Sequence, residues 1–501
     1  MSITGPGSIT AANIAAQTNM FNQLDKLSTE LSTGQAAQTY SDLGSQSGLA
    51  LSLSAQLAAL GGYSNTATTV GTTLSIAQSA LTGISGSAAA VQQSLEQPEA
   101  FSLGSNGQTA TQASAASELD QIVSLLNIQV GNNYIFSGSG VNQPSVADAN
   151  TILNGNGAQA GLTQLIAARQ QADLGSGGLG RLGLATAGST VTVSQDGSPF
   201  GFQLTGVNSS LTGASATGPS GVPPSISIDI GATPPNAGDT IQFNLTLPDG
   251  SSQVITLTAT NASPPGANQF TIGATAGATA TNLQAALTTA LGNLAQTALP
   301  ASSAITAAND FFNVEPPQIV AGPPYDTSMS LVSGTPANTV FWYTGENGAT
   351  PALQTALAQV GPSTTVAYGM RANEPAFSNI LANVAALAAT TYSANDPNAQ
   401  ASYDALSQKV QANLAGQSGT QTVADIEADL ANAQTTIKNA TDLNTQTQTT
   451  LTNMLQKIDG VDQNQIGEQI LTLQNSLSAS LSVSARLAQL SLVNFLSPVT
   501  G

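Results

Sequence analysis

Clustered acidic side chains are the groups in this chain whose type and spacing could suggest metal binding or catalysis. The sequence contains no Cys and no His, which excludes thiolate nucleophiles, imidazole bases and the H-E-x-x-H zinc site of metalloproteases. Asp425, Glu427 and Asp429 form one acidic group. Residues two apart on a helix diverge by about 200°, so these carboxylates cannot share one cation. We interpret them as the first turns of a helix that Thr420 or Thr422 caps, because negative charge there complements the helix dipole.

The remaining candidate sites have structural interpretations. Asp459 and Asp462 mark a helix boundary, and Asp249 followed by Gly250 indicates a turn. A glycosidase needs two carboxylates that face one cleft. No such pair can be read from the sequence for five acidic residues of the middle region: Asp229, Asp239, Glu315, Asp326 and Glu346. We therefore predict that the chain is not an enzyme and that it has no catalytic, metal or cofactor site.

Composition narrows the classes of partner. At 501 residues the chain should divide into about two to four domains. It has 8 Lys and Arg against 27 Asp and Glu, a net charge of −19, so binding to nucleic acid or to an anionic membrane surface is disfavoured. Charged residues make up only 7% of the chain, and none of the cations lies between Arg181 and Arg371. Such a surface offers little electrostatic hindrance to the packing of many identical copies.

The N-terminal residues 1–14 have neither a basic segment nor an apolar core, so we expect no cleaved secretory signal. No run of 18 or more apolar residues occurs, so we expect no membrane span. If the protein is external, another export route must carry it.

Two long helical seams must provide the framework of the molecule. Their apolar positions recur at steps of four and three, a period of 3.5 that is typical of coiled-coil packing. We predict that each helix is the partner of the other, with the following residues in the seams: Val70, Leu74, Leu81, Ile84, Val91 and Leu95 in the first, and Val423, Ile426, Leu430, Ile437, Leu451, Met454 and Ile458 in the second. The second seam is interrupted by Asn444 and Thr447, which either set the helix register as a buried polar pair or lie partly solvated in a bundle of several helices.

The middle of the chain follows a different period. Strands are predicted at 226–230, 241–247 and 255–259, because apolar and polar residues alternate there. The Asp249-Gly250 pair between the last two strands predicts a β-hairpin. An Ala-rich helix over residues 282–299 should pack on this sheet.

The predicted fold is an α-helical, coiled-coil-like rod formed by the N- and C-terminal segments, with an inserted α+β, β-rich middle region. We place the terminal assembly helices at 1–45 and 462–501, the helical rod at 46–140 and 370–461, and the insertion of one or two domains at 141–369. The terminal helices are amphipathic, and Gly34 ends the first of them. They lack partners within the chain and should order when copies assemble through Leu24, Leu27, Leu31, Leu473, Leu477, Leu481, Leu487, Leu490 and Phe495.

Several segments resemble the flagellin superfamily. Leu31-Ser32-Thr33-Gly34 looks like the "LSTG" that follows the first flagellin helix, and the segment 471–496 is similar to the family's closing helix and apolar tail. Residues 131–138, Gly-Asn-Asn-Tyr-Ile-Phe-Ser-Gly, resemble a stretch typical of hook-associated protein 3, the junction subunit between hook and filament. Residues 341–345 and 368–374 also look like segments of alphaproteobacterial members of that branch. Residues 38–44 depart from the R-I-N-S-A-x-D-D-A-A run of many filament flagellins.

The resemblance implies a structural, non-enzymatic subunit of the external bacterial flagellum. Such a subunit is a homo-oligomer in a helical assembly and contacts other axial proteins, namely hook-associated proteins and flagellin. It leaves the cell through the flagellar type III apparatus with the help of an export chaperone. We expect the junction role, with a filament flagellin as the alternative.

A secreted adhesin or glycan-binding protein that uses the middle insertion is the alternative of another class. The run Phe341-Trp342-Tyr343 contains the only Trp and would be either its carbohydrate or peptide platform or part of a core. Core packing is favoured, because this region is rich in Gly and Pro and short of aromatic residues.

Overall fold

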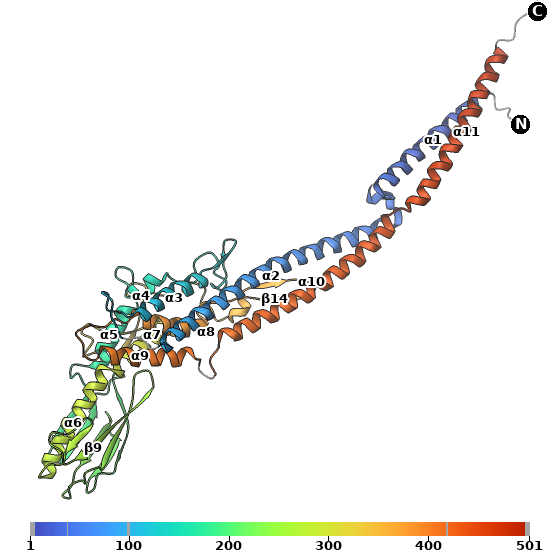
Figure 1. Cartoon of the computed structure of the whole chain (residues 1–501). Coiled ribbons are helices and arrows are strands. Elements are labelled where there is room, and N and C mark those ends of the chain that lie inside the picture. The colour runs from blue at the N-terminus through green and yellow to red at the C-terminus, as the bar shows by residue number, and fades with distance from the viewer. Residues whose placement is uncertain (1–5, 38, 98–100, 417–418, 496–501) are drawn as a thin grey trace, which may run out of the picture. The chain divides into compact units, whose positions relative to one another are not determined.

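The computed structural model describes residues 6–37, 39–97, 101–416 and 419–495 (Figure 1). The chain divides into two compact units, each made of segments that are far apart in the sequence. We call them the terminal unit (residues 1–69, 358–366 and 435–501) and the central unit (residues 70–357 and 367–434). Two long helices, α2 (Ser47–Glu96) and α10 (Val423–Asp459), contribute to both units.

The terminal unit is helical. Helix α1 (Pro6–Thr33) packs along α11 (Gln463–Phe495), so the two ends of the chain form a helix pair (Figure 1). Gly34 ends α1 with a φ of +71°, as predicted. Its carbonyl accepts a hydrogen bond from the Val461 amide (3.2 Å), which ties the end of α1 to the α10–α11 connection. A 3₁₀ segment, η1 (Tyr40–Gln46), then leads into α2.

Helices α3 (Ala110–Leu126), α4 (Ala149–Asn154), α5 (Leu162–Leu174), α7 (Ala298–Phe312), α8 (Pro375–Ala389) and α9 (Ala399–Leu414) form the helical part of the central unit. Helix α8 lies at its centre, because it contacts α3, α4, α5, α7 and α9. Most α8 side chains are buried, and many of them are Ala. Small side chains let neighbouring helices approach closely on several sides.

Two four-stranded sheets lie within residues 182–296, which we call the β-module. The first sheet is antiparallel, in the order β3 (Leu182–Ala187), β4 (Thr190–Gln195), β7 (Ser225–Asp229) and β6 (Ser215–Ser220). The second has the order β10 (Gln269–Thr271), β9 (Ser252–Thr260), β8 (Thr240–Thr246) and β5 (Gln203–Ser209), and only β10 runs parallel to its neighbour. Helix α6 (Ala276–Gln296) packs against strands of both sheets.

One apolar core joins the two sheets and α6. It contains the alternating residues that predicted the strands, among them Ile226, Ile228 and Phe243, together with Leu283 and Leu287 of α6. The predicted hairpin is confirmed: β8 and β9 are antiparallel with Thr246 opposite Ser252, and Gly250 in the turn has a φ of +81°.

The helix predicted over 282–299 has a different start and a different end in the structure. Helix α6 begins earlier, where the Thr275 side chain accepts a hydrogen bond from the Ala278 amide. It ends before Thr297, whose non-helical backbone separates it from α7. Pro300 lies in the first turn of α7, where its missing N–H breaks no helical hydrogen bond.

Short elements complete the chain: the two-stranded pairs β1 (Gln129–Val130) with β2 (Asn133–Tyr134), β11 (Gln318–Val320) with β12 (Leu331–Ser333), and β13 (Leu357–Gln359) with β14 (Thr365–Ala367), and the 3₁₀ turn η2 (Ala352–Thr355). The structure thus has long N-terminal helices, a β-containing middle region and C-terminal helices, as predicted. Coiled-coil geometry and the domain boundaries stay predictions. Helices α5 and α7, from the predicted insertion, contact α8, which follows the boundary placed after residue 369.

Candidate functional site

The seam residues within the central unit lie buried. These residues are Val70, Leu74, Leu81, Ile84, Val91, Val423, Ile426 and Leu430, whereas Leu95, near the end of α2, is half-buried. A hydrogen bond from Gln434 Nε2 to Gln78 Oε1 (3.1 Å) joins α10 to α2 within this unit. The two seams therefore face other parts of the protein rather than solvent along this stretch.

The seam within the terminal unit is less complete. Leu451 is buried in a cluster with Leu53 and Leu60 of α2, and Ile437 is also buried. Ile458 packs against this cluster and is half-buried. Met454 is 50% exposed, so its prediction as a seam residue is wrong in this chain.

Helix geometry explains why the residue after Met454 faces inward instead. Leu455, one position further along α10, is half-buried. A helix of 3.6 residues per turn drifts by about 20° per heptad against a strict 3.5 repeat, which moves the inward position by one residue after several turns.

Asn444, which interrupts the second seam, has a partner that the sequence did not indicate. Its side chain is 2% exposed, and its Nδ2 donates to the carbonyl of Val360 (2.8 Å), in the β13–β14 hairpin of the same unit. Thr447 is half-buried and donates to the Leu443 carbonyl of its own helix (2.8 Å). The two polar residues do not form the buried pair that was one of the alternatives. Asn444 instead anchors a non-helical segment to α10.

The terminal helices have a partner within the chain, contrary to the expectation that they have none. Helices α1 and α11 pack on each other, and Gln17 Nε2 donates to Ser484 Oγ (2.8 Å). Leu24, Leu27 and Leu31 are half-buried, as is Leu473, and Leu477 is buried. The periodicity located the apolar faces but could not show that they face each other.

A single α1–α11 pair still leaves much of its apolar surface uncovered. Large apolar side chains that remain exposed are Ile14 (64%), Phe21, Leu471, Leu481 (46%), Val483 and Leu487. Leu490 and Phe495 belong to α11, but their side chains lie outside the described residues. Two helices can cover only one stripe of each other, so further apolar faces need further partners.

The three segments that resemble the junction branch meet at one place in the central unit. The Gly138 amide donates to the Met370 carbonyl (3.0 Å), and the Ala372 amide donates to the Phe136 carbonyl (2.8 Å). The amide of Glu346 donates to the carbonyl of Ser137 (2.9 Å). Segments 131–138, 341–345 and 368–374 are therefore joined directly or through residue 346, although more than 200 residues separate the first from the other two.

The side-chain contacts where these three segments meet explain why the segments contain Arg371, Gly138 and Trp342. Arg371 pairs with Glu346 and donates to the Gly348 carbonyl (2.9 Å). Gly138 has a φ of +65°, and a Cβ there would lie 2.9 Å from Glu346 Oε2 and 3.1 Å from Arg371 Nε, so any other residue would be strained. Trp342 is 2% exposed and packs on Phe312 with ring centroids 5.2 Å apart. The favoured interpretation of Trp342 as a core residue agrees with this burial.

A buried ion network lies where the β-module meets α5 and α7. Arg169 Nε lies 2.9 Å from Asp173 Oδ2, and its Nη1 lies 2.8 Å from Asp310 Oδ2. Burial raises the pKa of Asp173. Burial also raises the pKa of Asp310 to about 6, although the charge of Arg169 acts in the opposite direction. The Gly201 amide, close to β5, donates to Asp173 (2.9 Å) and connects the β-module to this network.

Two further cations link the β-module to its surroundings. Arg181 Nη1 lies 2.9 Å from Asp196, and its Nη2 donates to the Ser328 carbonyl (2.7 Å). Lys409 of α9 lies 2.5 Å from Asp249 Oδ2 in the β8–β9 turn. Burial opposes ionisation of Asp249, but hydrogen bonds from Lys409 and its other neighbours hold its pKa below the usual range. The turn predicted at Asp249-Gly250 is thus also an anchor, which its local sequence did not reveal.

The acidic groups considered as cation sites act at helix ends. Thr422 Oγ1 accepts from the Asp425 amide (3.3 Å), and Asp425 Oδ2 accepts from the Thr422 amide (2.8 Å), so Thr422 caps α10. Asp462 Oδ1 accepts from the Asn464 amide (3.0 Å) at the start of α11. Within the described residues, no group of three or more acidic side chains is placed to hold a metal ion. The interpretations as helix boundaries are confirmed.

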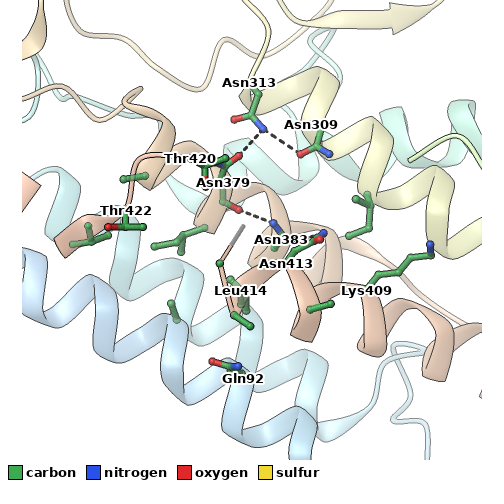
Figure 2. Close-up of a pocket in the computed structure, with 18 of the residues that line it drawn as sticks. Gln92, Asn309, Asn313, Asn379, Asn383, Lys409, Asn413, Leu414, Thr420 and Thr422 are labelled. Atoms are coloured by element: carbon green, nitrogen blue, oxygen red, sulfur yellow. Dashed lines mark hydrogen bonds between the residues drawn. The ribbon is translucent and has the colours of Figure 1, made fainter. Parts of the chain in front are cut away.

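A pocket of about 790 Å³ opens in the central unit between α2, α7, α8, α9 and the start of α10 (Figure 2). Asn side chains from three of these helices form its polar wall. Asn313 Nδ2 donates to Asn309 Oδ1 and to Asn379 Oδ1 (both 3.1 Å). Asn413 Nδ2 donates to Asn383 Oδ1 (2.8 Å). Nothing in the sequence pointed to this pocket, because its residues come from segments about 330 residues apart.

One helical stretch, Leu43–Glu96, is long and apolar enough to cross a membrane by length and composition alone. This differs from the expectation that no candidate exists, because that expectation counted consecutive apolar residues. The core helix of a soluble protein passes the same test. Leu74, Leu81 and Ile84 of this stretch are fully buried in the protein.

Comparison with known families bears on the first part of the chain, which contains α1, η1, α2, α3, β1 and β2. Residues 8–140 match the family model for the bacterial flagellin N-terminal helical region. The match supports a relation to the flagellin superfamily. The matched residues include the first seam. They also include segment 131–138, one of the three segments that meet in the central unit. A comparison with the curated proteins gave no match.

Proposed function

We propose that this protein is a structural subunit of the bacterial flagellum that polymerises through its terminal helices. The observation that carries the proposal is the match of residues 8–140 to the flagellin N-terminal helical region. The incompletely covered α1–α11 pair supports it, because Ile14, Phe21 and Leu481 remain exposed in a single chain. Neighbouring copies would cover these faces in a helical assembly. A structural subunit of this kind is not an enzyme.

Within the flagellum, we propose the hook–filament junction as its place. This finer assignment rests on the resemblance of segments 131–138, 341–345 and 368–374 to the junction branch and on the absence of the run typical of filament flagellins after the first helix. That the three segments pack together supports treating them as one feature. The protein would be exported through the type III apparatus with a chaperone and would contact hook-associated proteins and flagellin.

Deletion of the gene tests this function. Cells should then make hooks without filaments, while the filament subunit is still produced and is released into the medium. Normal filaments on the deletion strain would contradict the junction role. Finding the polypeptide as the major protein of sheared filaments would assign it to the filament instead. Finding it in neither filament nor hook–basal-body preparations would contradict the flagellar assignment as a whole.

A deletion of the β-module tests where assembly resides. The two ends of this module lie together, since a Cβ on Gly180 would come within 3.2 Å of the Leu299 side chain. A short linker can therefore replace residues 183–297. We expect this variant to restore some filament growth to the deletion strain, because assembly is assigned to the terminal helices. A variant that also lacks residues 1–39 should restore none.

A further inference from the structure

The pocket in Figure 2 has both polar and apolar walls and carries no net charge among its described lining residues. The charged groups there are Asp249 and Lys409, whose oxygen and nitrogen atoms lie 2.5 Å apart. The whole chain, in contrast, has a net charge of −19. Copies of an acidic protein repel each other, and a neutral concave surface is a place where they can approach closely.

The pocket wall favours a ligand with peptide-like groups. The Asn309 side chain accepts from Asn313 and, within the described residues, makes that contact alone, so its N–H donors remain available. The floor between the amides is formed by small or aliphatic side chains, including Ala88, Ala376 and Ile380. No aromatic ring on which a sugar would stack is among the described lining residues. Amide side chains beside small apolar groups match an extended, uncharged peptide with small side chains.

The volume also suits a short segment. About 790 Å³ lies within the range of roughly 300–1,000 Å³ in which proteins enclose most of a ligand's surface. Charged residues are only 7% of this chain, so uncharged segments are abundant in it. We propose that in the assembled state this pocket receives an uncharged peptide segment from a second copy of the chain. The inference rests on the proposed polymerisation and adds a contact away from the terminal helices.

Single-cysteine variants test the inference, because the chain has no Cys of its own. Ala412 lines the pocket on α9 and is exposed, and Ala262 lies in an exposed segment outside it. We expect a soluble maleimide to label A412C at least tenfold more slowly in the polymer than in the monomer. Labelling of A262C, the matched control, should change less than threefold. Equal labelling of A412C in both states would overturn the inference.

A cross-linking experiment identifies the occupant. The A412C variant is joined to a benzophenone maleimide, and chains with and without ¹⁵N are polymerised together and irradiated. Mass spectrometry should find cross-links between the two isotopic forms, to a peptide without Asp, Glu, Lys or Arg. Cross-links confined to one chain, or to a charged segment, would overturn the inference. Slow labelling already in the monomer, with a sugar released on denaturation, would assign the pocket to a glycan instead.

Filling the pocket gives an independent readout. The A412W variant should raise the critical concentration for polymerisation at least tenfold, whereas A412S should leave it unchanged. Circular dichroism of the monomers checks that both variants fold. Equal critical concentrations for folded A412W and the original chain would overturn the inference while leaving the proposed function intact. A chain that forms no polymer under any condition would overturn both.

Discussion

Helix α8 and the α1–α11 pair differ in how much of their apolar surface is covered by the same chain. Helix α8 is buried by neighbours on several sides, and Phe377, Leu381 and Leu387 are fully buried. The α1–α11 pair buries one stripe and leaves Ile14 and Leu481 largely exposed. Burial of apolar surface is the main favourable term in folding. The comparison teaches that α8 is covered by its own chain, whereas the α1–α11 pair leaves apolar surface that neighbouring copies would cover in the proposed assembly.

The largest expected effect comes from a matched pair of Leu→Asp substitutions, one in the central unit and one in the α1–α11 pair. Leu81→Asp places an uncompensated carboxylate at a position with no exposure, and it should destabilise the central unit by about 5 kcal/mol. Leu481→Asp, at 46% exposure, should change monomer stability by under about 1 kcal/mol but weaken polymerisation. Denaturant unfolding followed by Trp342 fluorescence measures the first effect, and sedimentation of polymer measures the second. Equal losses of monomer stability would contradict the comparison.

Arg169→Ala tests whether the central unit depends on its buried charges. Removing the guanidinium leaves Asp173 and Asp310 unpaired in the interior, which should cost about 4 kcal/mol. Lys438→Ala is the control, because it breaks an exposed pair with Asp442 and should cost less than about 0.5 kcal/mol. The midpoint of urea unfolding measures both. A loss for R169A no greater than that for K438A would show that the network is energetically unimportant.

The pH dependence of the unfolding free energy further tests the role of the buried charges in the central unit. The pKa of Asp310 is raised from 3.8 to about 6, so between these values the folded protein binds more protons than the unfolded chain. Stability relative to Asp310→Asn should therefore fall as the pH rises from about 4 to 6, by up to about 3 kcal/mol. Asp425 gives the opposite sign: the hydrogen bonds from Thr422 lower its pKa, so its contribution is lost as the pH falls below 4. Thermal unfolding of wild type, D310N and D425N from about pH 2.5 to 7.5 checks both directions.

The smallest effect concerns the interrupted seam of the terminal unit. Asn444→Ala should cost about 1–2 kcal/mol, because it leaves the buried Val360 carbonyl without its hydrogen bond. Thr447→Ala should cost much less, because Thr447 bonds only within its own helix among the described residues. Helix unfolding followed at 222 nm compares the two. A similar cost for both variants would mean that Asn444 does not anchor the β13–β14 hairpin.

Local patterns predicted the secondary structure well where one period dominates. The alternation at 241–247 and 255–259 with Asp249-Gly250 between them predicted β8, β9 and their turn, because a strand with one buried face must alternate. Cap chemistry identified Gly34 as one helix end and either Thr420 or Thr422 as another, and the structure shows that Thr422 is the cap. The helix predicted over 282–299 began too late and ran past the break at Thr297, because Ala-rich sequence favours helix on both sides of the break, and α7 beyond it was not predicted.

By itself the sequence determined the helical seams, the β-rich middle region, the lack of thiol and imidazole chemistry, and a resemblance that the match of residues 8–140 supports. These depend on residue type and on spacing over a few turns. Only the tertiary structure decided that α1 packs on α11, that Asn444 binds Val360, and that Lys409 binds Asp249. These contacts join residues up to about 470 positions apart, and neither spacing nor composition specifies which distant segment fills a given face. The Asn-lined pocket is of the same kind, since it exists only where helices from both ends of the chain meet the end of the β-module.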